Sequence, residues 1–432
     1  MTLFWFRRDL RLADNTALHF ALTENPQVLP IFIFDTNILE KLPKNDARVA
    51  FIHQQIASIN TELQKIGKRL AVFYGNPIDV FKKLTAENSI KNIYANRDYE
   101  PQARKRDKEV YDFLGSKNIL FKSYKDQVIF EKNEVVKADG TPYLVFTPFS
   151  KKWKENFNEK CLSEHKTEPY FQNFAQHSYP FLSLNDIGFT TAEMLVKPFV
   201  LNDLFVEKYA QRRNFPEFEG SNLSVHLRFG TVSIRKIIAK IIQQKDETFL
   251  NELIWREFFM YFLWHFPNSV TNDFRTTFEN IKWENNAIYF EKWCNGQTGY
   301  PMVDAGMREL NQTGYMHNRV RMVVASFLCK HLLIDWRLGE AYFAEKLLDY
   351  EQSSNIGNWQ WSAGCGVDAA PYFRVFNPSE QIKKFDPDYK YIKKWVPEVF
   401  TNIYPKPIVE HKEAREKFLN LFKKTKEGVQ KI

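Results

Sequence analysis

Five short apolar runs, separated by helical patterns, occupy the first 125 residues and restrict the fold of this chain most. The helical pattern is clearest over Arg48–Ile66, where apolar residues recur every three or four positions. Strands that alternate with helices predict an α/β domain with a doubly wound, parallel, five-stranded sheet. RRDLRLADN follows the first strand in place of a GxGxxG fingerprint, so a standard dinucleotide site is not expected. The predicted strands are Leu3–Phe6, Val28–Phe34, Arg69–Tyr74, Ile90–Ala95 and Ile119–Ser123.

The remainder of the 432 residues changes character twice. A chain of this length predicts two domains, and we place the first at residues 1–127. Residues 128–199 have no clear period and are predicted to form a connector. Residues 200–432 are predicted to form an all-α domain, in which eight of the ten tryptophans lie between Trp255 and Trp395. The helical patterns there are Leu250–His265, Ala305–Leu310, Asn318–Leu333 and Gly339–Leu348.

Composition limits the compartment and the partners. The net charge of +8 is compatible with a nucleic-acid partner, although lysines also keep a surface solvated. No apolar run reaches the roughly 18 residues of a membrane helix, and charges in the first strand argue against a signal peptide. The widely spaced cysteines predict neither a disulfide framework nor a metal site, and favour the cytoplasm. They are Cys161, Cys294, Cys329 and Cys365.

The segment NELIWREFF, residues 251–259, combines charged and aromatic side chains. On a helix, Glu252, Trp255 and Arg256 share one face with Phe259. Burying two charges is costly unless they are paired. Two interpretations stay open: a Glu252–Arg256 pair on a solvated face, or a pocket in which Trp255 stacks on a base and Glu252 accepts its hydrogen bonds.

A second mixed face lies in MHNRVRMVVASFL, residues 316–328. The spacing of Asn318, Arg321, Met322 and Ala325 brings an amide, a cation and a soft apolar side chain together. This pattern indicates either a pocket or an ordinary amphipathic helix with its methionine in the core.

Two serines in GSNLSVHLRFGTVS, residues 220–233, precede a helix that we predict to begin near Val232. Hydroxyl groups and free backbone N–H groups at a helix start suit a phosphate. Serine is also a common helix cap, so Ser221 and Ser224 are only candidates.

Residues 349–378, DYEQSSNIGNWQWSAGCGVDAAPYFRVFNP, concentrate aromatic side chains among small ones. Small residues let a backbone approach something flat and large. The stretch indicates either a tightly packed glycine-rich turn or the wall of a planar cofactor's pocket. Its aromatic residues include Trp359, Trp361, Tyr372, Phe373 and Phe376.

Together these segments resemble the DNA photolyase and cryptochrome flavoproteins, most of all class I cyclobutane pyrimidine dimer photolyases. The resemblance covers almost the whole chain in one order. It rests on WFRRDLRLADN, NELIWREF, GYPMVDAGMRELNQTGYMHNRVRM, LLIDWR, GNWQWSAGCGVDAAPYFRVFNP and YPKPIVEHKEAR.

The resemblance implies one FAD per chain, bound in the helical domain and active as FADH⁻. In this family Arg321 and Asp349 would form a charge pair at the isoalloxazine, and Asn355 would face its N5 edge. A neutral amide at this last position is typical of the repair enzymes. The implied FAD-binding residues are Tyr209, Ser221, Leu223, Ser224, Arg256, Asn318, Arg321, Asp349, Glu351 and Asn355.

The resemblance also implies an electron relay and a lesion site. Trp359, Trp336 and Trp283 would carry electrons from the surface to the flavin. The lesion would be flipped out of the duplex, with Glu252, Asn318, Met322 and Asn355 as catalytic residues. Relatives that repair the (6-4) photoproduct carry histidines where this chain has other residues, which favours the cyclobutane dimer. The implied DNA-contacting residues are Glu252, Trp255, Asn318, Arg319, Met322, Trp361, Lys383 and Lys384.

Some positions depart from the family pattern. Gly220 stands near a usual threonine, Glu351 replaces a common aspartate, and Ile356 replaces a frequent asparagine. Ala103 stands where some relatives have the glutamate that binds a folate antenna, and no matching histidine lies near Pro43. A folate antenna is therefore disfavoured, and a deazaflavin, a second flavin or no antenna stay open.

The resemblance therefore predicts a monomeric, cytoplasmic, light-driven lyase with access to DNA that splits cyclobutane pyrimidine dimers. The alternative is a cryptochrome-type blue-light photoreceptor that signals through a partner. The chain ends soon after YPKPIVEHKEAREKFLNLF, without the long tail that signalling cryptochromes often carry, and this favours the lyase.

Overall fold

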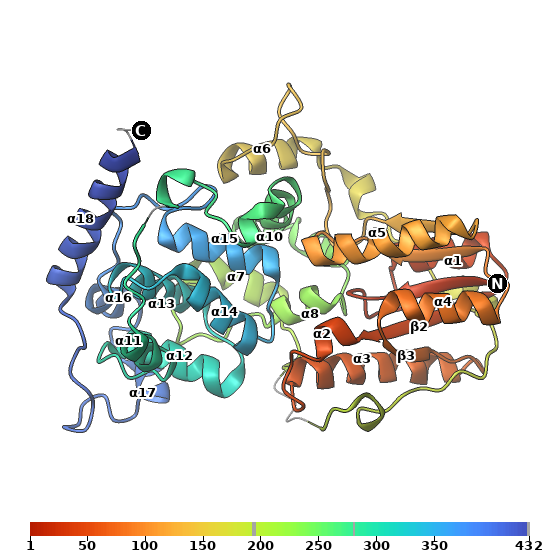
Figure 1. The fold of residues 1–432 in the computed structure, drawn as a ribbon, viewed down its shortest axis with the longest axis horizontal. Coiled ribbons are helices and arrows are strands. Elements are labelled where there is room, and N and C mark those ends of the chain that lie inside the picture. Colours follow the sequence, from red (N-terminus) through yellow and green to blue (C-terminus); the bar gives the residue numbers. More distant parts are fainter. Residues whose placement is uncertain (192–195, 280, 430–432) are drawn as a thin grey trace. The chain divides into compact units, whose positions relative to one another are not determined.

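The computed structural model describes residues 1–191, 196–279 and 281–429, and the remaining positions of the predicted connector and helical domain lie outside this description. The chain forms two compact units, each built from several segments. The α/β unit contains Met1–Val135, Trp153–Phe199 and Asn222–Lys245. The helical unit contains Val136–Lys152, Val200–Ser221 and Asp246–Ile432. Figure 1 labels their elements.

The α/β unit is built on a parallel sheet in the order β3-β2-β1-β4-β5. The central β1 is entirely buried, and its Leu3 lies opposite Leu29 of β2 and Ile93 of β4. The prediction of a doubly wound five-stranded sheet is confirmed, with shifts of one or two residues at strand ends. The strands are β1 (Thr2–Phe6), β2 (Val28–Asp35), β3 (Ala71–Gly75), β4 (Asn92–Asn96) and β5 (Leu120–Tyr124).

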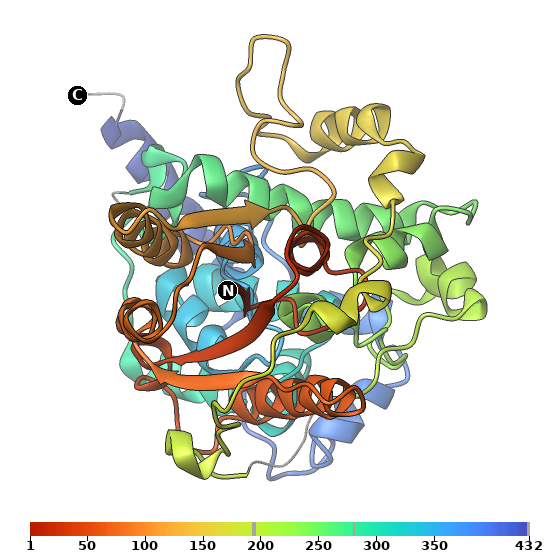
Figure 2. The ribbon, with the colours of Figure 1, turned by 90° about the vertical axis from the view of Figure 1, so that its right-hand side faces the viewer.

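Helices cover both faces of this sheet. Figure 2 shows α4 and α5 on one side and α1 and α3 on the other, as right-handed crossovers require when the strand order reverses at β1. These and the remaining helical segments of the unit are α1 (Thr16–Glu24), α2 (Thr36–Leu39), α3 (Ala47–Gln64), α4 (Pro77–Glu87), α5 (Pro101–Ser116), η1 (Glu159–Leu162), η2 (Glu168–Asn173), η3 (Asn185–Ile187), α8 (Leu223–Phe229) and α9 (Ile234–Ile241).

The helical unit packs α15 against α10, α13 and α14. The prediction of a mostly helical C-terminal region is confirmed, and α14 begins at Trp336 because the Asp335 side chain accepts a hydrogen bond from the N–H of Arg337. Its helices are α7 (Asp203–Arg212), α10 (Thr248–His265), η4 (Pro267–Val270), η5 (Thr276–Phe278), α11 (Ala287–Cys294), α12 (Pro301–Thr313), α13 (Asn318–Lys330), α14 (Trp336–Lys346), α15 (Gln352–Ala363), α16 (Pro378–Phe385), α17 (Lys390–Trp395) and α18 (His411–Val429). Helix α6 (Phe146–Asn156) begins in this unit and ends in the other.

The serine segment precedes a helix close to Val232, as predicted, since Ser233 caps α9. The prediction missed a separate short helix, α8, which already begins at Leu223 and contains Ser224 in its first turn. Among the described residues, no helix is both long and apolar enough to cross a membrane.

Buried ion pairs attach α9 to the sheet in the α/β unit. Asp126 lies between Arg11 and Arg235, with closest N–O distances of 2.6 and 2.9 Å. Burial alone would raise the pKa of Asp126, but Arg11 and Arg235 hold it well below its usual value. Because α9 comes from a distant part of the sequence, these pairs hold residues 222–245 within this unit.

We predict that Asp126→Asn lowers the stability of the α/β unit by about 3 kcal/mol, because it leaves the buried Arg11 without its counter-charge and Arg235 with Asp14 alone. The measurement is the first transition in urea unfolding at neutral pH. Since the folded-state pKa of Asp126 is lowered, its contribution is present above the unfolded-state pKa and is lost as the pH falls. The difference between parent and variant should therefore shrink in acid.

The control is Asp79→Asn, because Asp79 pairs with Lys82 on the exposed surface and should matter little. Equal destabilisation by both variants would contradict a special role for the buried cluster.

Candidate flavin and substrate site

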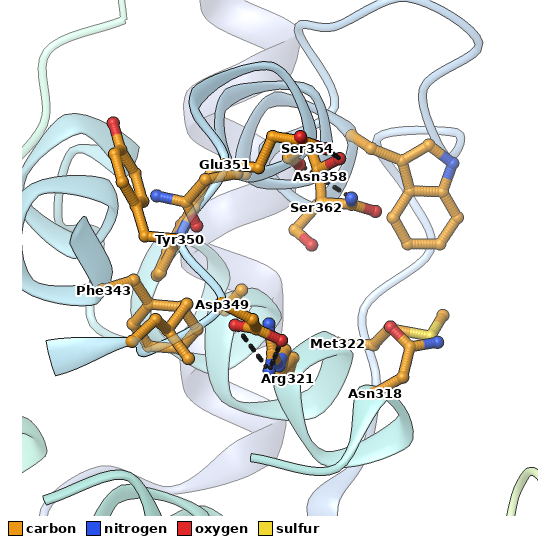
Figure 3. A pocket seen from close by; sticks show the side chains of 15 residues that line it. Asn318, Arg321, Met322, Phe343, Asp349, Tyr350, Glu351, Ser354, Asn358 and Ser362 are labelled. Atoms are coloured by element: carbon orange, nitrogen blue, oxygen red, sulfur yellow. Dashed lines mark hydrogen bonds and ion pairs between the residues drawn. The ribbon is translucent and has the colours of Figure 1, made fainter. Parts of the chain in front are cut away.

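A pocket in the helical unit is bordered by α13, α14, α15 and the residues that join α14 to α15. Figure 3 shows Arg321 and Met322 of α13 across this pocket from Asn358 of α15. The lining residues are Asn318, Arg321, Met322, Ala325, Phe343, Leu347, Asp349, Tyr350, Glu351, Ser354, Asn355, Asn358, Trp359, Trp361 and Ser362.

Helix α13 presents its four predicted residues to the pocket, so the helical spacing found in the sequence gives the correct face. The helix is capped by His317, whose Nδ1 accepts a hydrogen bond from the N–H of Arg319. Burial, followed by the charges of Arg321 and Arg319, lowers the pKa of His317 to about 4. The ring is therefore neutral at neutral pH and can act as this acceptor.

Two ion pairs border the pocket. Arg321 donates from Nη2 to both carboxylate oxygens of Asp349 at 2.9 and 3.2 Å, as the dashed lines in Figure 3 mark. Arg256 of α10 donates to Glu351 at 3.2 Å. The structure therefore pairs Arg321 with Asp349, and the longer Glu351 at the place of a common aspartate still reaches a cation.

The proposed Glu252–Arg256 self-pair on a solvated face is wrong. Glu252 forms an ion pair of 2.6 Å with Arg213, which follows α7, because Arg256 is engaged by Glu351. Burial raises the pKa of Glu252, and Arg213 opposes this shift. Glu252 lies outside the residues that line the pocket. Asn214, next to Arg213, accepts a hydrogen bond from Arg319 at 2.5 Å.

Asn355 is oriented by a carboxylate that the sequence did not reveal. Its Nδ2 donates to the side chain of Glu340 at 2.9 Å and to the Glu340 backbone oxygen at 3.2 Å. Burial raises the pKa of Glu340, while hydrogen bonds from Asn355 and Tyr350 oppose the shift. Since a backbone oxygen can only accept, the amide must turn its NH₂ group toward α14. Its oxygen is then available to a ligand in the pocket.

Trp255 lies beneath a second aromatic ring. The ring of Phe146 stacks on it with centroids 3.7 Å apart and planes 7° apart. Phe146 is held in place because its N–H donates to Asp368 and because Phe149, three residues on, is buried against Phe258. One face of Trp255 is therefore covered, and Trp255 does not line the pocket.

Trp359 and Trp361 both line the pocket, although they lie about 200° apart around a helix. Trp359 is buried and packs on Gly339 of α14, where a Cβ atom would collide with the indole. Gly339 lies one turn after Trp336, which is also buried. Trp283 is partly buried and precedes Glu284, whose N–H donates to Leu333 close to the start of α14.

Several predicted ligands lie outside the pocket lining. Tyr209 and Ser221 belong to the helical unit, whereas Leu223 and Ser224 belong to the α/β unit. The Oγ of Ser224 is buried and has no hydrogen-bond partner among the described residues. An orphaned buried hydroxyl is unusual and suits a polar ligand such as a phosphate.

Two of the predicted DNA-contacting cations, Lys383 and Lys384, lie on α16, and the third, Arg319, lies on α13. Lys383 and Lys384 are exposed in the last turn of α16, where Lys383 pairs with Glu380 at 2.6 Å. The guanidinium of Arg319 lies 4.4 Å above the ring of Phe385, at the end of the same helix. These side chains form basic surface outside the pocket lining.

Four residues of the site were not found from the sequence, namely Arg213, Asn214, Glu340 and Phe146. Arg213 and Asn214 follow a helix and do not belong to its period, and Phe146 lies about 110 residues before its partner. Glu340 lies on a helix that was predicted, but nothing in its spacing or its neighbours distinguishes it from an ordinary charged residue of that helix.

Comparisons with known proteins agree with this arrangement. Residues 2–169 match the family model described as DNA photolyase, and residues 249–402 match the FAD binding domain of DNA photolyase. The curated deoxyribodipyrimidine photo-lyase of a Synechococcus species is 35% identical over 99% of this chain and 97% of its own length.

Solved structures of photolyases and of a cryptochrome also resemble this chain over almost its whole length. A class III photolyase from Agrobacterium tumefaciens has a TM-score of 0.88 at 32% identity and covers 99% of this chain and 98% of its own. An archaeal photolyase from Sulfolobus tokodaii, described with two FAD molecules, has a TM-score of 0.82 at 35% identity and covers 98% and 99%. A Synechocystis cryptochrome has a TM-score of 0.82 at 26% identity and the same coverage.

The fold and the pocket therefore define a flavoprotein with an N-terminal α/β unit and a helical FAD-binding domain. The chain belongs to the DNA photolyase and cryptochrome family.

We predict that Glu340→Leu weakens FAD binding about tenfold, the effect of losing one or two hydrogen bonds that orient a ligand group. Without the side-chain acceptor, the Asn355 amide keeps only the longer hydrogen bond to the Glu340 backbone oxygen and is oriented less firmly. The measurement is fluorescence titration of flavin-free protein with FAD. Glu340→Gln is the matched control, because it retains an acceptor oxygen and should bind FAD as the parent does. Parent-like affinity of Glu340→Leu would contradict the orienting role.

Proposed function

We propose that this chain is a light-driven lyase that splits cyclobutane pyrimidine dimers in DNA. The observation that carries the proposal is the convergence of Asn318, Met322, Asn355 and Trp361 on one pocket that also holds the Arg321–Asp349 pair. When bound there in its reduced form, FAD supplies the electron that opens the cyclobutane ring and takes it back afterwards.

The residues of the pocket fit this cofactor. The Arg321–Asp349 and Arg256–Glu351 pairs supply fixed charges to the pocket wall, and Asn355 offers an oriented amide oxygen. The orphaned hydroxyl of Ser224 supports a phosphate contact by the segment around it. We propose one FAD per chain, with Tyr209, Ser221 and Leu223 as further ligands.

The substrate assignment rests on chemistry that fits a flipped pyrimidine pair. Trp361 offers an aromatic ring, Met322 a polarizable apolar contact, and Asn318 a donor and an acceptor. Glu252 supports the assignment because it lies on the same face of α10 as Trp255, where its carboxyl group can hydrogen-bond the lesion. Phe146 would leave one face of Trp255 to the bases.

The proposal also covers the supply of electrons to the flavin, the contacts with DNA, the oligomeric state and the location of the protein. Trp359, Trp336 and Trp283 would re-reduce the flavin, which the packing of Trp359 on α14 supports. Arg319, Lys383 and Lys384 would contact DNA phosphates. We further propose a monomer in the cytoplasm. The class I assignment is a proposal too, and the likeness to a class III enzyme gives it no support.

The second candidate function is a cryptochrome-type photoreceptor, which the likeness to the Synechocystis cryptochrome favours. The deciding experiment illuminates purified, fully reduced protein with duplex oligonucleotides that carry one thymine dimer. We expect the dimer to be removed in blue light and to persist in the dark. A dimer that persists in light with reduced FAD bound would overturn the lyase assignment. Parallel oligonucleotides with a (6-4) photoproduct test the choice of lesion.

We predict that Glu252→Ala lowers the repair rate about tenfold, the expected effect of losing one hydrogen bond to a charged group. Flavin content should be unchanged, because Glu252 does not line the pocket. Repair rate and bound flavin are measured on the same preparations. Glu345→Gln, which removes an exposed pair with Lys346, is the control. Equal losses of flavin and repair would mean that Glu252 serves structure alone.

A further inference from the structure

One tryptophan ring, that of Trp293, is in direct contact with Trp359, whereas the relay proposed above runs through a different one, Trp336. The inference below rests on that proposed relay. Trp293 of α11 meets Trp359 directly, with ring centroids 6.1 Å apart and planes at 67°. Trp336 lies one turn before Gly339, on which the Trp359 indole packs. An electron vacancy on Trp359 could therefore be filled from either neighbour, and their surroundings must decide which.

Trp336 is in contact with a buried negative charge. Its Nε1–H donates to Oδ1 of Asp273 at 2.7 Å, and the Asp273 side chain is only 2% exposed. Arg337 also donates to Oδ1 of Asp273, and its guanidinium lies 4.7 Å from the Trp336 ring. This cation is 36% exposed, so solvent screens it more than it screens the carboxylate. Of the two charged groups beside Trp336, the one that is closer and more deeply buried, the Asp273 carboxylate, is therefore negative.

A third group at Asp273 is the buried thiol of Cys365. Burial, followed by the Asp273 carboxylate, raises the pKa of Cys365 well above its usual value. The thiol is therefore neutral at neutral pH and adds no charge of its own. The carboxylate dominates the electrostatics at the Trp336 nitrogen.

Trp293 has no comparable charge in contact with it among the described residues. It is fully buried, and its Nε1–H donates to the backbone oxygen of Val324 at 3.3 Å. Aromatic rings surround it, with Phe290, Tyr342 and Phe343 at centroid distances of 5.8, 5.7 and 6.1 Å. A positive charge in such a place would lack both water and a counter-ion, which is costly.

We propose that Asp273 is the residue that directs the electron vacancy from Trp359 to Trp336 and away from Trp293. Trp359 gives one electron to the photoexcited oxidised flavin, and Trp336 gives one electron to the Trp359 radical cation. No bond forms or breaks, and the proton stays on Nε1 of Trp336. The new radical cation lies against the Asp273 carboxylate, and the two charges cancel. The same electron taken from Trp293 would leave an uncompensated cation.

The test removes the charge and retains the hydrogen bond. Asp273→Asn keeps an acceptor oxygen for Trp336, so its expected effect comes from electrostatics. We expect photoreduction of the oxidised flavin to slow about tenfold, the difference between a charge-assisted and a neutral hydrogen bond. Asp273→Glu, which restores the charge, should recover most of this loss. The measurements are steady-state flavin bleaching and transient absorption, on preparations matched for flavin content.

A second variant, Trp293→Phe, tests whether the electron vacancy reaches Trp293. Trp293→Phe should change photoreduction less than about twofold in the parent, where the vacancy goes to Trp336. In the Asp273→Asn background it should remove most of the residual tryptophan radical signal, because part of the vacancy then rests on Trp293. Electron paramagnetic resonance of samples with deuterated tryptophan distinguishes the two radicals.

Three outcomes would overturn the inference. These are parent-like photoreduction by Asp273→Asn, failure of Asp273→Glu to recover any of its loss, and parent-like photoreduction by Trp336→Phe. Dimer repair by chemically reduced protein does not use the relay and should be unchanged in Asp273→Asn. A parent that photoreduces its flavin but repairs no dimer would contradict the proposed lyase activity and leave this test intact.

Discussion

The close approach of α15 to two neighbouring helices is the constraint on which the candidate site depends. Gly357 of α15 packs on the ring of Phe259 in α10, and Gly339 of α14 packs on Trp359. A Cβ atom at either glycine would collide with the ring beside it. Because both contacts are backbone against ring, α15 can lie close to both helices at once. The pocket lies on the side of α15 that faces α13.

This close packing explains why polar groups at the site act in pairs drawn from different elements. Asp349 is held by Arg321 of α13, and Glu351 by Arg256 of α10. Asn355 of α15 is held by Glu340 of α14. A buried charge without a partner would be strongly destabilising, so each pair also fixes how the two elements meet. The site and the helix packing therefore stabilise each other.

The sequence predicts what depends on local periodicity and fails where contacts span long distances. The five strands follow from short apolar runs that alternate with helical patterns. The pocket face of α13 follows from spacing, since residues three and four positions apart share a side of a helix. The partners of Glu252 and Asn355 do not follow, because an ion pair or a hydrogen bond between distant segments leaves no period in either one. Glu252 pairs with Arg213, while the nearby Arg256 pairs with Glu351. The helix that contains Ser224 was missed because α8 is too short to show a period.

Charged groups are distributed differently on the two sides of α15. The charges of the two ion pairs at the pocket, Arg321–Asp349 and Arg256–Glu351, nearly cancel. On the other side of α15 the balance differs, because Asp273 is buried while its partner Arg337 reaches solvent. In the proposed relay, positive charge that leaves Trp359 would therefore meet a carboxylate at Trp336, whereas Trp293 donates only to a backbone oxygen. On this proposal, α15 lies between the cofactor pocket and the path that positive charge takes outward.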